Sequence, residues 1–344
     1  MNSNKQNKYS VLLHKLVTIL IFAPLLLCAC FEAETPVKPY PRGDAKVKVI
    51  EMGPDYEEQY FFRFETNSII SQSSRDKWDL AFQSYGDDHF IILNGAKVME
   101  AADMGNLDFE SVKDRSQAVF KYDSTNGNYE DYAIGKWWET NNDSIFSKNH
   151  VYIINRGRDI GGKRIGYVKM QILSADRQGY NIRFSDMDGE NEFFRQIPRD
   201  SNFNYMMFSF DDGGTIYEIE PNRHEWDIKF TRFLAFLPYN NSLLPYSVTG
   251  VLINHTLTEA SADSIKPFNQ ITLEDIDNYT FSKSPGFIGH EWKNFELNGE
   301  VYTAKDYITY IMKDVRGFYW KFRFIDFYND DRQRGYPKFE FIKL

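Results

Sequence analysis

Side chains that could coordinate a metal or attack a substrate are few in this chain, and they are scattered. After the first 30 residues the sequence holds five histidines: His89, His150, His224, His255 and His290. None of them has the spacing of a zinc-protease or zinc-finger site. No serine, cysteine or acidic residue stands in a recognisable nucleophile–base pattern either. We therefore expect no enzyme activity and no structural metal site.

The N-terminus predicts export and a lipid anchor. Lys5, Lys8 and Lys15 precede an apolar run that ends in Cys28-Ala29-Cys30. A basic start followed by a short apolar run is typical of a signal peptide, here residues 1–29. Small side chains before Cys30 favour cleavage there and acylation of its thiol, which would tether the chain to a lipid bilayer. An ordinary secretory signal and a short membrane anchor remain the alternatives.

Composition favours β structure behind this anchor. Aromatic residues make up 17% of the 344 residues, and such side chains suit pleated, half-buried surfaces. Residues 30–45 are proline-rich and predict an extended tether. Short apolar runs separated by turns then follow, with at most one or two short helices, within residues 103–118 and 259–277. The net charge of -9 excludes nucleic acid as an expected partner.

An internal repeat divides the chain. DKWDLAF contains Trp78 and HEWDIKF contains Trp226, 148 positions later. Later landmarks recur at an offset of 155, among them Trp137 with Trp292. Three further pairs are expected at this offset: Tyr152 with Tyr307, Asn94 with Thr249, and Asp176 with Asp331. This predicts two tandem domains, residues 46–200 and 201–344, with about seven extra residues in the second copy near FLPYNNSLLPYS.

The Trp-Asp stretches themselves read as core strands. Alternation along a strand is expected to place the tryptophan, the aliphatic residue and the phenylalanine on one face and the aspartate on the other. A buried aromatic anchor and an aspartate that accepts backbone N–H groups explain the motif without a ligand.

Several of these segments together resemble the HmuY family of surface lipoproteins from Bacteroidetes. The resemblance rests on Trp78-Asp79-Leu80-Ala81-Phe82, on Asn94-Gly95, on Trp137, and on the strands VYIINRG (151–157) and YVKMQIL (167–173). It implies an all-β fold of two HmuY-like domains at the outer membrane or cell surface. It also implies non-catalytic capture of haem, for iron acquisition through a TonB-dependent outer-membrane receptor.

The family's histidine-ligated members carry a histidine on each side of the second-half tryptophan, and this chain departs from that pattern. No histidine or methionine closely follows Trp137, and near Trp292 only His290 is present. Haem iron accepts imidazole or thioether, so the candidate ligands are His255 and His290, with Met99 and Met104 in the first copy. The alternative is a surface interaction module that has lost the haem ligands and binds a protein or a glycan.

Overall fold

The computed structural model describes residues 44–142, 144–296 and 301–344, and these lie in one compact unit that begins at Arg42. The expected signal peptide, Cys30 and nearly all of the tether lie outside the described residues. Within the described part of the chain, no helix is both long and apolar enough to cross a membrane.

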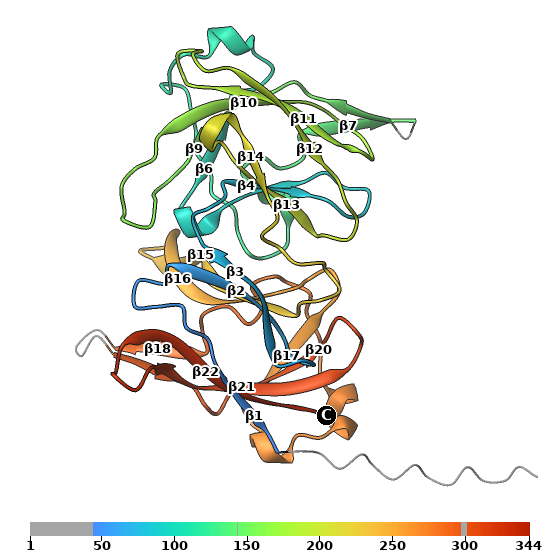
Figure 1. Cartoon of the computed structure of the whole chain (residues 1–344), viewed down its shortest axis with the longest axis vertical. Helices are drawn as coiled ribbons and strands as arrows, with labels where there is room; N and C mark the ends of the chain where they lie inside the picture. The colour runs from blue at the N-terminus through green and yellow to red at the C-terminus, as the bar shows by residue number, and fades with distance from the viewer. Residues whose placement is uncertain (1–43, 143, 297–300) are drawn as a thin grey trace, which may run out of the picture. The chain divides into compact units, whose positions relative to one another are not determined.

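The fold is all-β, as the composition predicts, and it forms two lobes with two main sheets each (Figure 1). One sheet of the first lobe is β12–β11–β10–β9–β6, formed by Phe193–Pro198, Gly179–Ser185, Tyr167–Ala175, Val151–Asn155 and Glu100–Asp103. The other is β14–β13–β4–β5, formed by Thr215–Tyr217, Tyr205–Ser209, Leu80–Gln83 and Ile91–Leu93.

The second lobe repeats this plan strand for strand. One sheet is β1–β22–β21–β20–β17, formed by Lys46–Val49, Arg334–Lys343, Tyr319–Tyr328, Thr309–Lys313 and Glu259–Asp263. The other is β16–β15–β2–β3, formed by Ser242–Ile253, Ile228–Tyr239, Glu58–Arg63 and Ser68–Ser74. Each lobe also carries a hairpin, β7–β8 (Trp138–Asn141 and Ser144–Ser147) or β18–β19 (Lys293–Glu296 and Val301–Ala304).

The helical segments of the described residues are all short 3₁₀ turns. They are Gly95–Lys97, Phe109–Ser111, Tyr129–Asp131, Asp211–Gly213, Phe268–Gln270 and Leu273–Asn278. Two of the six, Phe109–Ser111 and Phe268–Gln270, lie inside the two stretches where a short helix is expected, and Leu273–Asn278 overlaps the second stretch.

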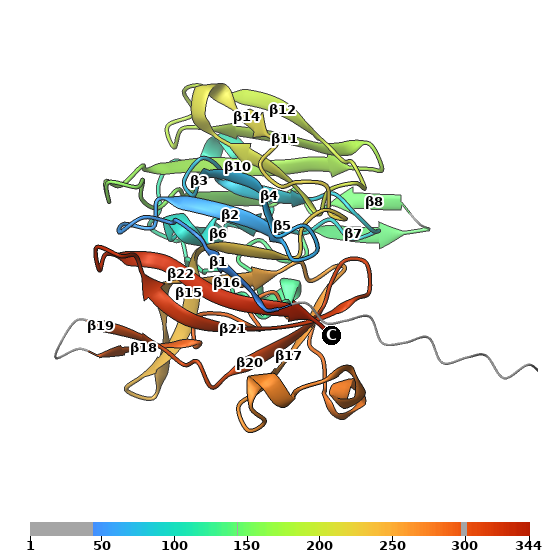
Figure 2. The same cartoon turned by 60° about the horizontal axis from the view of Figure 1, so that its bottom comes forward.

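The N-terminal strands complete the C-terminal lobe. β1 pairs with β22, and β2 pairs with β15. In the same way β12 pairs with β11, and β13 pairs with β4. The blue strands β1–β3 therefore lie among orange and red ones, with β1 beside β22 (Figures 1 and 2). The first lobe is continuous (80–217), whereas the second is built from 46–74 and 228–343, so the sheets do not follow the sequence division at residue 200.

The aspartate of each Trp-Asp stretch holds together the strands that meet in this arrangement. Asp79 accepts the backbone N–H of Phe210 at 2.8 Å, and Asp227 accepts that of Phe64 at 2.8 Å. Both carboxylates are fully buried. Burying a charged group without partners is costly, so these bonds explain why the motif carries an aspartate, as the sequence predicts.

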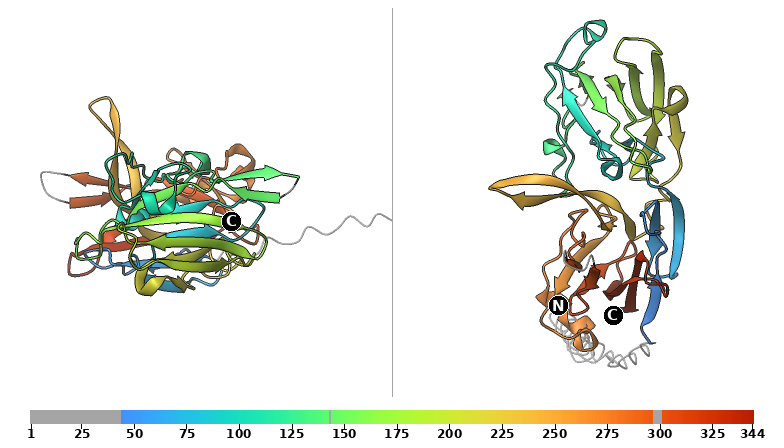
Figure 3. Two further views of the ribbon diagram at one scale, coloured as in Figure 1. Left: turned by 90° about the horizontal axis from the view of Figure 1, so that it is seen from above. Right: turned by 90° about the vertical axis from the view of Figure 1, so that its left-hand side faces the viewer.

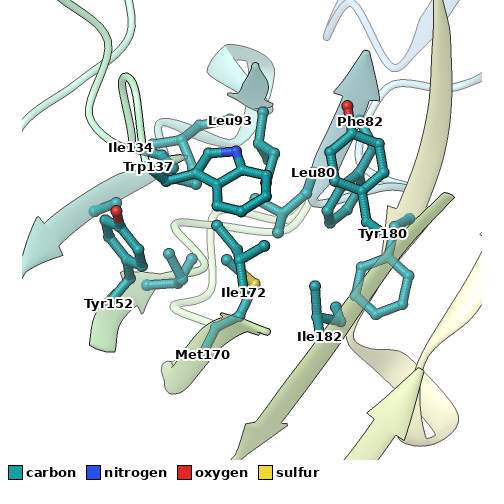
Figure 4. Packing of buried hydrophobic residues seen from close by; sticks show 14 of the residues in the cluster. Leu80, Phe82, Leu93, Ile134, Trp137, Tyr152, Met170, Ile172, Tyr180 and Ile182 are labelled. Carbon is teal, nitrogen blue, oxygen red and sulfur yellow. The ribbon is translucent and has the colours of Figure 1, made fainter. Parts of the chain in front are cut away.

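The tryptophans are buried, as expected, but not on the face that strand alternation predicts. Leu80 and Phe82 point into the first lobe's core, where Figure 4 shows Phe82 close to Tyr180. Trp78 instead packs with Trp226 in a separate cluster. The alternation rule fails here because Trp78 precedes β4, which begins at Leu80.

The structure corrects part of the repeat alignment. Asn94 donates to the backbone oxygens of Arg75 and Trp78, and Asn254 makes the equivalent bonds in the second lobe. Asn254, rather than Thr249, is therefore the counterpart of Asn94. Similarly, Tyr310 is buried on β20 at the position that Tyr152 occupies on β9, whereas Tyr307 is exposed. Tyr310, rather than Tyr307, is therefore the counterpart of Tyr152.

The extra residues of the second copy extend one hairpin. β15 and β16 have 12 residues each, whereas the corresponding β4 and β5 have four and three. The tip, Asn240-Asn241, has positive φ at both residues, as a tight two-residue hairpin turn requires. In the right-hand view of Figure 3 this hairpin reaches out from the side of the unit.

Candidate functional site

A groove with a volume of about 480 Å³ runs beside β15, and His290 lies in its wall. Its apolar lining combines residues of β15 with residues of the segments around positions 287 and 308. These are Phe233, Phe236, Phe287, Ile288, Ile308 and Tyr310. Lys305 and Glu291 add one charge of each sign. The groove therefore offers aromatic walls, one imidazole and a cation close together.

The His290 ring packs against a neighbouring side chain but makes no hydrogen bond among the described residues. It packs edge-on against Phe233, with the ring centroids 6.5 Å apart. Neither ring nitrogen makes a hydrogen bond within the described part of the chain. Burial lowers the pKa of His290, and the nearby Lys293 lowers it further. The imidazole is therefore neutral at neutral pH, which is the form that binds a metal.

The other described histidines differ from His290 in this respect. His89 contacts Arg199, His150 pairs with Asp103 at 2.9 Å, and His255 contacts Tyr129 at 2.5 Å. His224 is exposed and lines none of the pockets described. Among these five, His290 alone combines an unpaired imidazole with an apolar groove.

His255 lies in a different place. It borders a smaller cavity, of about 130 Å³, that both lobes line. Its Nε2 atom is within 3.5 Å of three tyrosine hydroxyls, those of Tyr85, Tyr129 and Tyr205. Burial lowers the pKa of His255 to about 4, with Arg223 contributing. This imidazole is therefore neutral too, but hydroxyl groups already occupy its surroundings.

The methionine candidates pack against hydrophobic clusters in this structure. Met99 is fully buried in the core of the first lobe, and Met104 packs against a smaller cluster around Phe109 and Val112. Neither lines a pocket that contains His255 or His290. The four candidate ligands are therefore spread over separate places, and no group of three or more His, Cys, Asp or Glu among the described residues could hold a metal ion.

Part of this site could not be found from the sequence. His290 was marked by its position two residues before Trp292, but nothing marked Phe233 and Phe236 as its neighbours. The signal available was the insertion that lengthens β15, since extra residues beside a repeated core often build a surface feature.

Comparison with known proteins assigns the chain to a family. The family model described as HmuY protein matches residues 55–180 and again 201–341, which together are more than half of the chain. No curated protein matches the chain. The structure is similar to that of the apo HmuY analog of Tannerella forsythia, with a TM-score of 0.32 and 12% identity over 88% of this chain and 98% of that one. It is similar also to apo PinO from Porphyromonas gingivitis, with a TM-score of 0.29 and 9% identity over 88% and 98%. The two separate matches to the family model show that this chain belongs to the HmuY family, as a tandem duplication.

Proposed function

We propose that this chain is a surface lipoprotein that binds haem, or a related tetrapyrrole, without catalysis in the groove around His290. The single observation that carries the proposal is the unpaired, neutral imidazole of His290 in an aromatic groove. Haem iron takes imidazole as an axial ligand, and family membership makes a tetrapyrrole the first ligand to consider.

The dimensions and lining of the groove support a flat, largely apolar ligand. Its volume of about 480 Å³ falls in the range of about 300–1,000 Å³ typical of small-molecule sites. Phe233 and Phe287 supply aromatic contact area, which stacks well on a conjugated ring. Lys305 provides a positive charge for a propionate group.

The anchor and the receptor complete the proposal. Acylated Cys30 would hold the chain at the outer membrane or cell surface, and a TonB-dependent receptor would take the ligand from it. Replacing Cys30 with alanine should release the protein from membranes into the soluble fraction. Retention of the Cys30→Ala protein on membranes would contradict lipidation at this residue.

A second candidate function is protein or glycan binding through the β15–β16 hairpin. Tyr239, Leu243 and Tyr246 are 55%, 62% and 46% exposed near its tip. Exposed apolar and tyrosine side chains on a projecting element are typical of interaction surfaces. In this case the chain would no longer bind a tetrapyrrole, and the hairpin would bind the protein or glycan.

Titration with haemin separates the two. We expect a saturable Soret shift for the unmodified protein and for His224→Ala, the exposed histidine control. His290→Ala should weaken binding by at least about tenfold, the equivalent of ~1.4 kcal/mol. His255→Ala, Met99→Ala and Met104→Ala complete the set, because each of these was a candidate from the sequence. Absence of a shift in both the ferric and ferrous states would exclude haem capture. Protein or glycan binding through the β15–β16 hairpin would then be the remaining candidate function.

A further inference from the structure

The cavity between the two lobes is a second recess, distinct from the groove. Its volume is about 130 Å³, comparable to buried cavities of about 150 Å³ that hold benzene. It is therefore too small for a tetrapyrrole. Phe233 and Leu234 line both recesses, so the two adjoin at this part of β15.

The walls of this cavity include seven Phe, Trp and Tyr side chains, and both lobes supply them. The first lobe and its connection contribute Trp78, Tyr129 and Tyr205. The second contributes Phe61 and Trp226, whose rings meet edge to face at 4.9 Å. A molecule held here would contact both lobes at once.

Lys229, on β15, is the unusual group of the cavity. Its ammonium lies 5.4 Å from the Phe61 ring centre and 5.5 Å from that of Trp78. In the described part of the chain it has neither a hydrogen-bond acceptor nor a carboxylate within 4.0 Å. An ammonium carries three donors and is costly to remove from water unless they are paired. The aromatic faces compensate only part of that cost.

The cavity also contains the carboxyl of Glu220, whose charge interacts with that of Lys229. Glu220 accepts the backbone N–H of Asn204 at 3.2 Å, and His255 contacts the hydroxyl of Tyr129. The Trp78 indole nitrogen is buried without an acceptor among the described residues. Glu220 therefore balances part of the charge of Lys229, but neither the Lys229 ammonium nor the Trp78 indole donates a hydrogen bond within the described part of the chain.

We propose that this cavity binds a small aromatic molecule that carries a carbonyl or carboxyl oxygen. The ring packs between the aromatic side chains of the two lobes, and the oxygen accepts a hydrogen bond from Lys229 Nζ. A charge-assisted bond of this kind is stronger than one between neutral groups.

The ionisation of Glu220 distinguishes an amide from an acid as ligand. Burial raises the pKa of the Glu220 carboxyl and lowers that of the Lys229 ammonium. Lys229 and Glu220 balance each other when both are ionised, and Arg232 and Asp123 also line the cavity. Burial raises the pKa of the Asp123 carboxyl to about 7. Benzoate would bring a further negative charge beside these carboxyls, so we expect it to bind more tightly as the pH falls and they take up protons, whereas neutral benzamide should depend less on pH.

The test is calorimetric titration of the complete chain with benzamide, benzoate and benzene. Lys229→Met removes the cation but keeps the side-chain length, and Lys283→Met is the control because Lys283 is exposed. Ile92→Phe fills the cavity from a partly buried position. Thermal unfolding of every variant confirms that it is folded.

We expect benzamide to bind at least about tenfold more tightly than benzene, the equivalent of ~1.4 kcal/mol. Lys229→Met should abolish this difference, Ile92→Phe should block all three ligands, and Lys283→Met should change nothing. The proposal is overturned if the folded protein binds none of the three. It is overturned equally if Lys229→Met binds benzamide as well as the unmodified chain does.

Discussion

Asp79 and Asp227 each accept a backbone N–H from the phenylalanine that follows a partner strand far away in the sequence. Phe210 is the donor in the first lobe and Phe64 in the second. Equivalent carboxylates thus join β4 to β13 in the first lobe and β15 to β2 in the second. In each lobe the two strands come from different sequence repeats. The Trp-Asp stretch recurs because this junction recurs.

The two aspartates differ in their partners, and removal of either should be costly. Asp79 also pairs with Lys97 at 2.5 Å and with Arg156 at 2.8 Å, both largely buried. Asp79→Ala leaves Lys97 unpaired and Arg156 with Asp211 alone, so we expect a loss of about 3–5 kcal/mol in the free energy of unfolding. Asp227→Ala leaves the N–H groups of Phe64 and Val315 unpaired, at about 1–3 kcal/mol for each unsatisfied group.

Urea denaturation monitored for each lobe measures both costs. Asp330→Ala, at an exposed position whose side chain makes no hydrogen bond among the described residues, should stay within about 0.5 kcal/mol of the unmodified protein. Similar small losses for Asp79→Ala and Asp227→Ala would contradict the buried junction.

The N-terminal strands should be required by the C-terminal lobe. A chain that begins at residue 76 lacks β1–β3, and with them the buried side chains of Phe62 and Phe64. We expect amide hydrogen exchange to lose protection throughout residues 228–343, while residues 80–217 stay protected. Adding a peptide of residues 44–75 should restore part of the lost protection. A fully protected second lobe in the shortened chain would disprove the exchange of strands.

Acid should destabilise the protein through His255. Its pKa is about 4 in the folded chain and 6.5 as the ordinary value, so protons bind more tightly to the unfolded state. The stabilising contribution is complete above pH 6.5 and is lost as the pH falls towards 4, by about 3 kcal/mol. His89, whose pKa is also about 4, contributes in the same direction. Asp123, Glu220 and Asp227, whose pKa values burial raises to about 7, 7 and 6, contribute in the opposite direction, so the effect of His255 is read from the difference between variant and unmodified protein.

Unfolding curves between pH 7 and 4 test this pH dependence. Compared with the unmodified protein, His255→Gln should lack the loss of about 3 kcal/mol that His255 contributes between pH 7 and 4, whereas His224→Gln should leave the dependence unchanged. An unaltered pH dependence in His255→Gln would show that His255 is not buried in its neutral form.

The charge of Lys305 should matter for tetrapyrrole affinity. Lys305→Gln removes the groove's cation, and we expect haemin to bind several-fold more weakly at low salt, with a smaller difference at about 1 M salt because charges are then screened. Lys283→Gln, at an exposed position outside the groove, is the control. Equal affinities of Lys305→Gln and the control at low salt would remove Lys305 from the site.

The sequence was sufficient for the all-β class and for the duplication, because Trp78 with Trp226 and Trp137 with Trp292 recur in order. It could not predict that β1–β3 join the second lobe. Equivalent strands of two similar repeats carry the same alternation, so the pattern of β2 fits β4 as well as β15. Which partner it takes depends on the path of the chain between lobes.

The site was predictable only in part for a similar reason. His290 could be noticed because it stands beside Trp292, but the sequence could not separate it from His255. That distinction depends on tyrosine hydroxyls around His255 and on phenylalanines around His290. Those neighbours come from distant segments, and one-dimensional spacing does not contain them.

The most direct test of the account is to locate the iron. Crystals of the complete mature chain grown with haemin can be measured at the iron absorption edge, where anomalous scattering marks the metal. We predict one anomalous peak at coordination distance from a ring nitrogen of His290, in the groove beside β15. A peak beside His255, Met99 or Met104, or one away from any of these side chains, would contradict the proposed site.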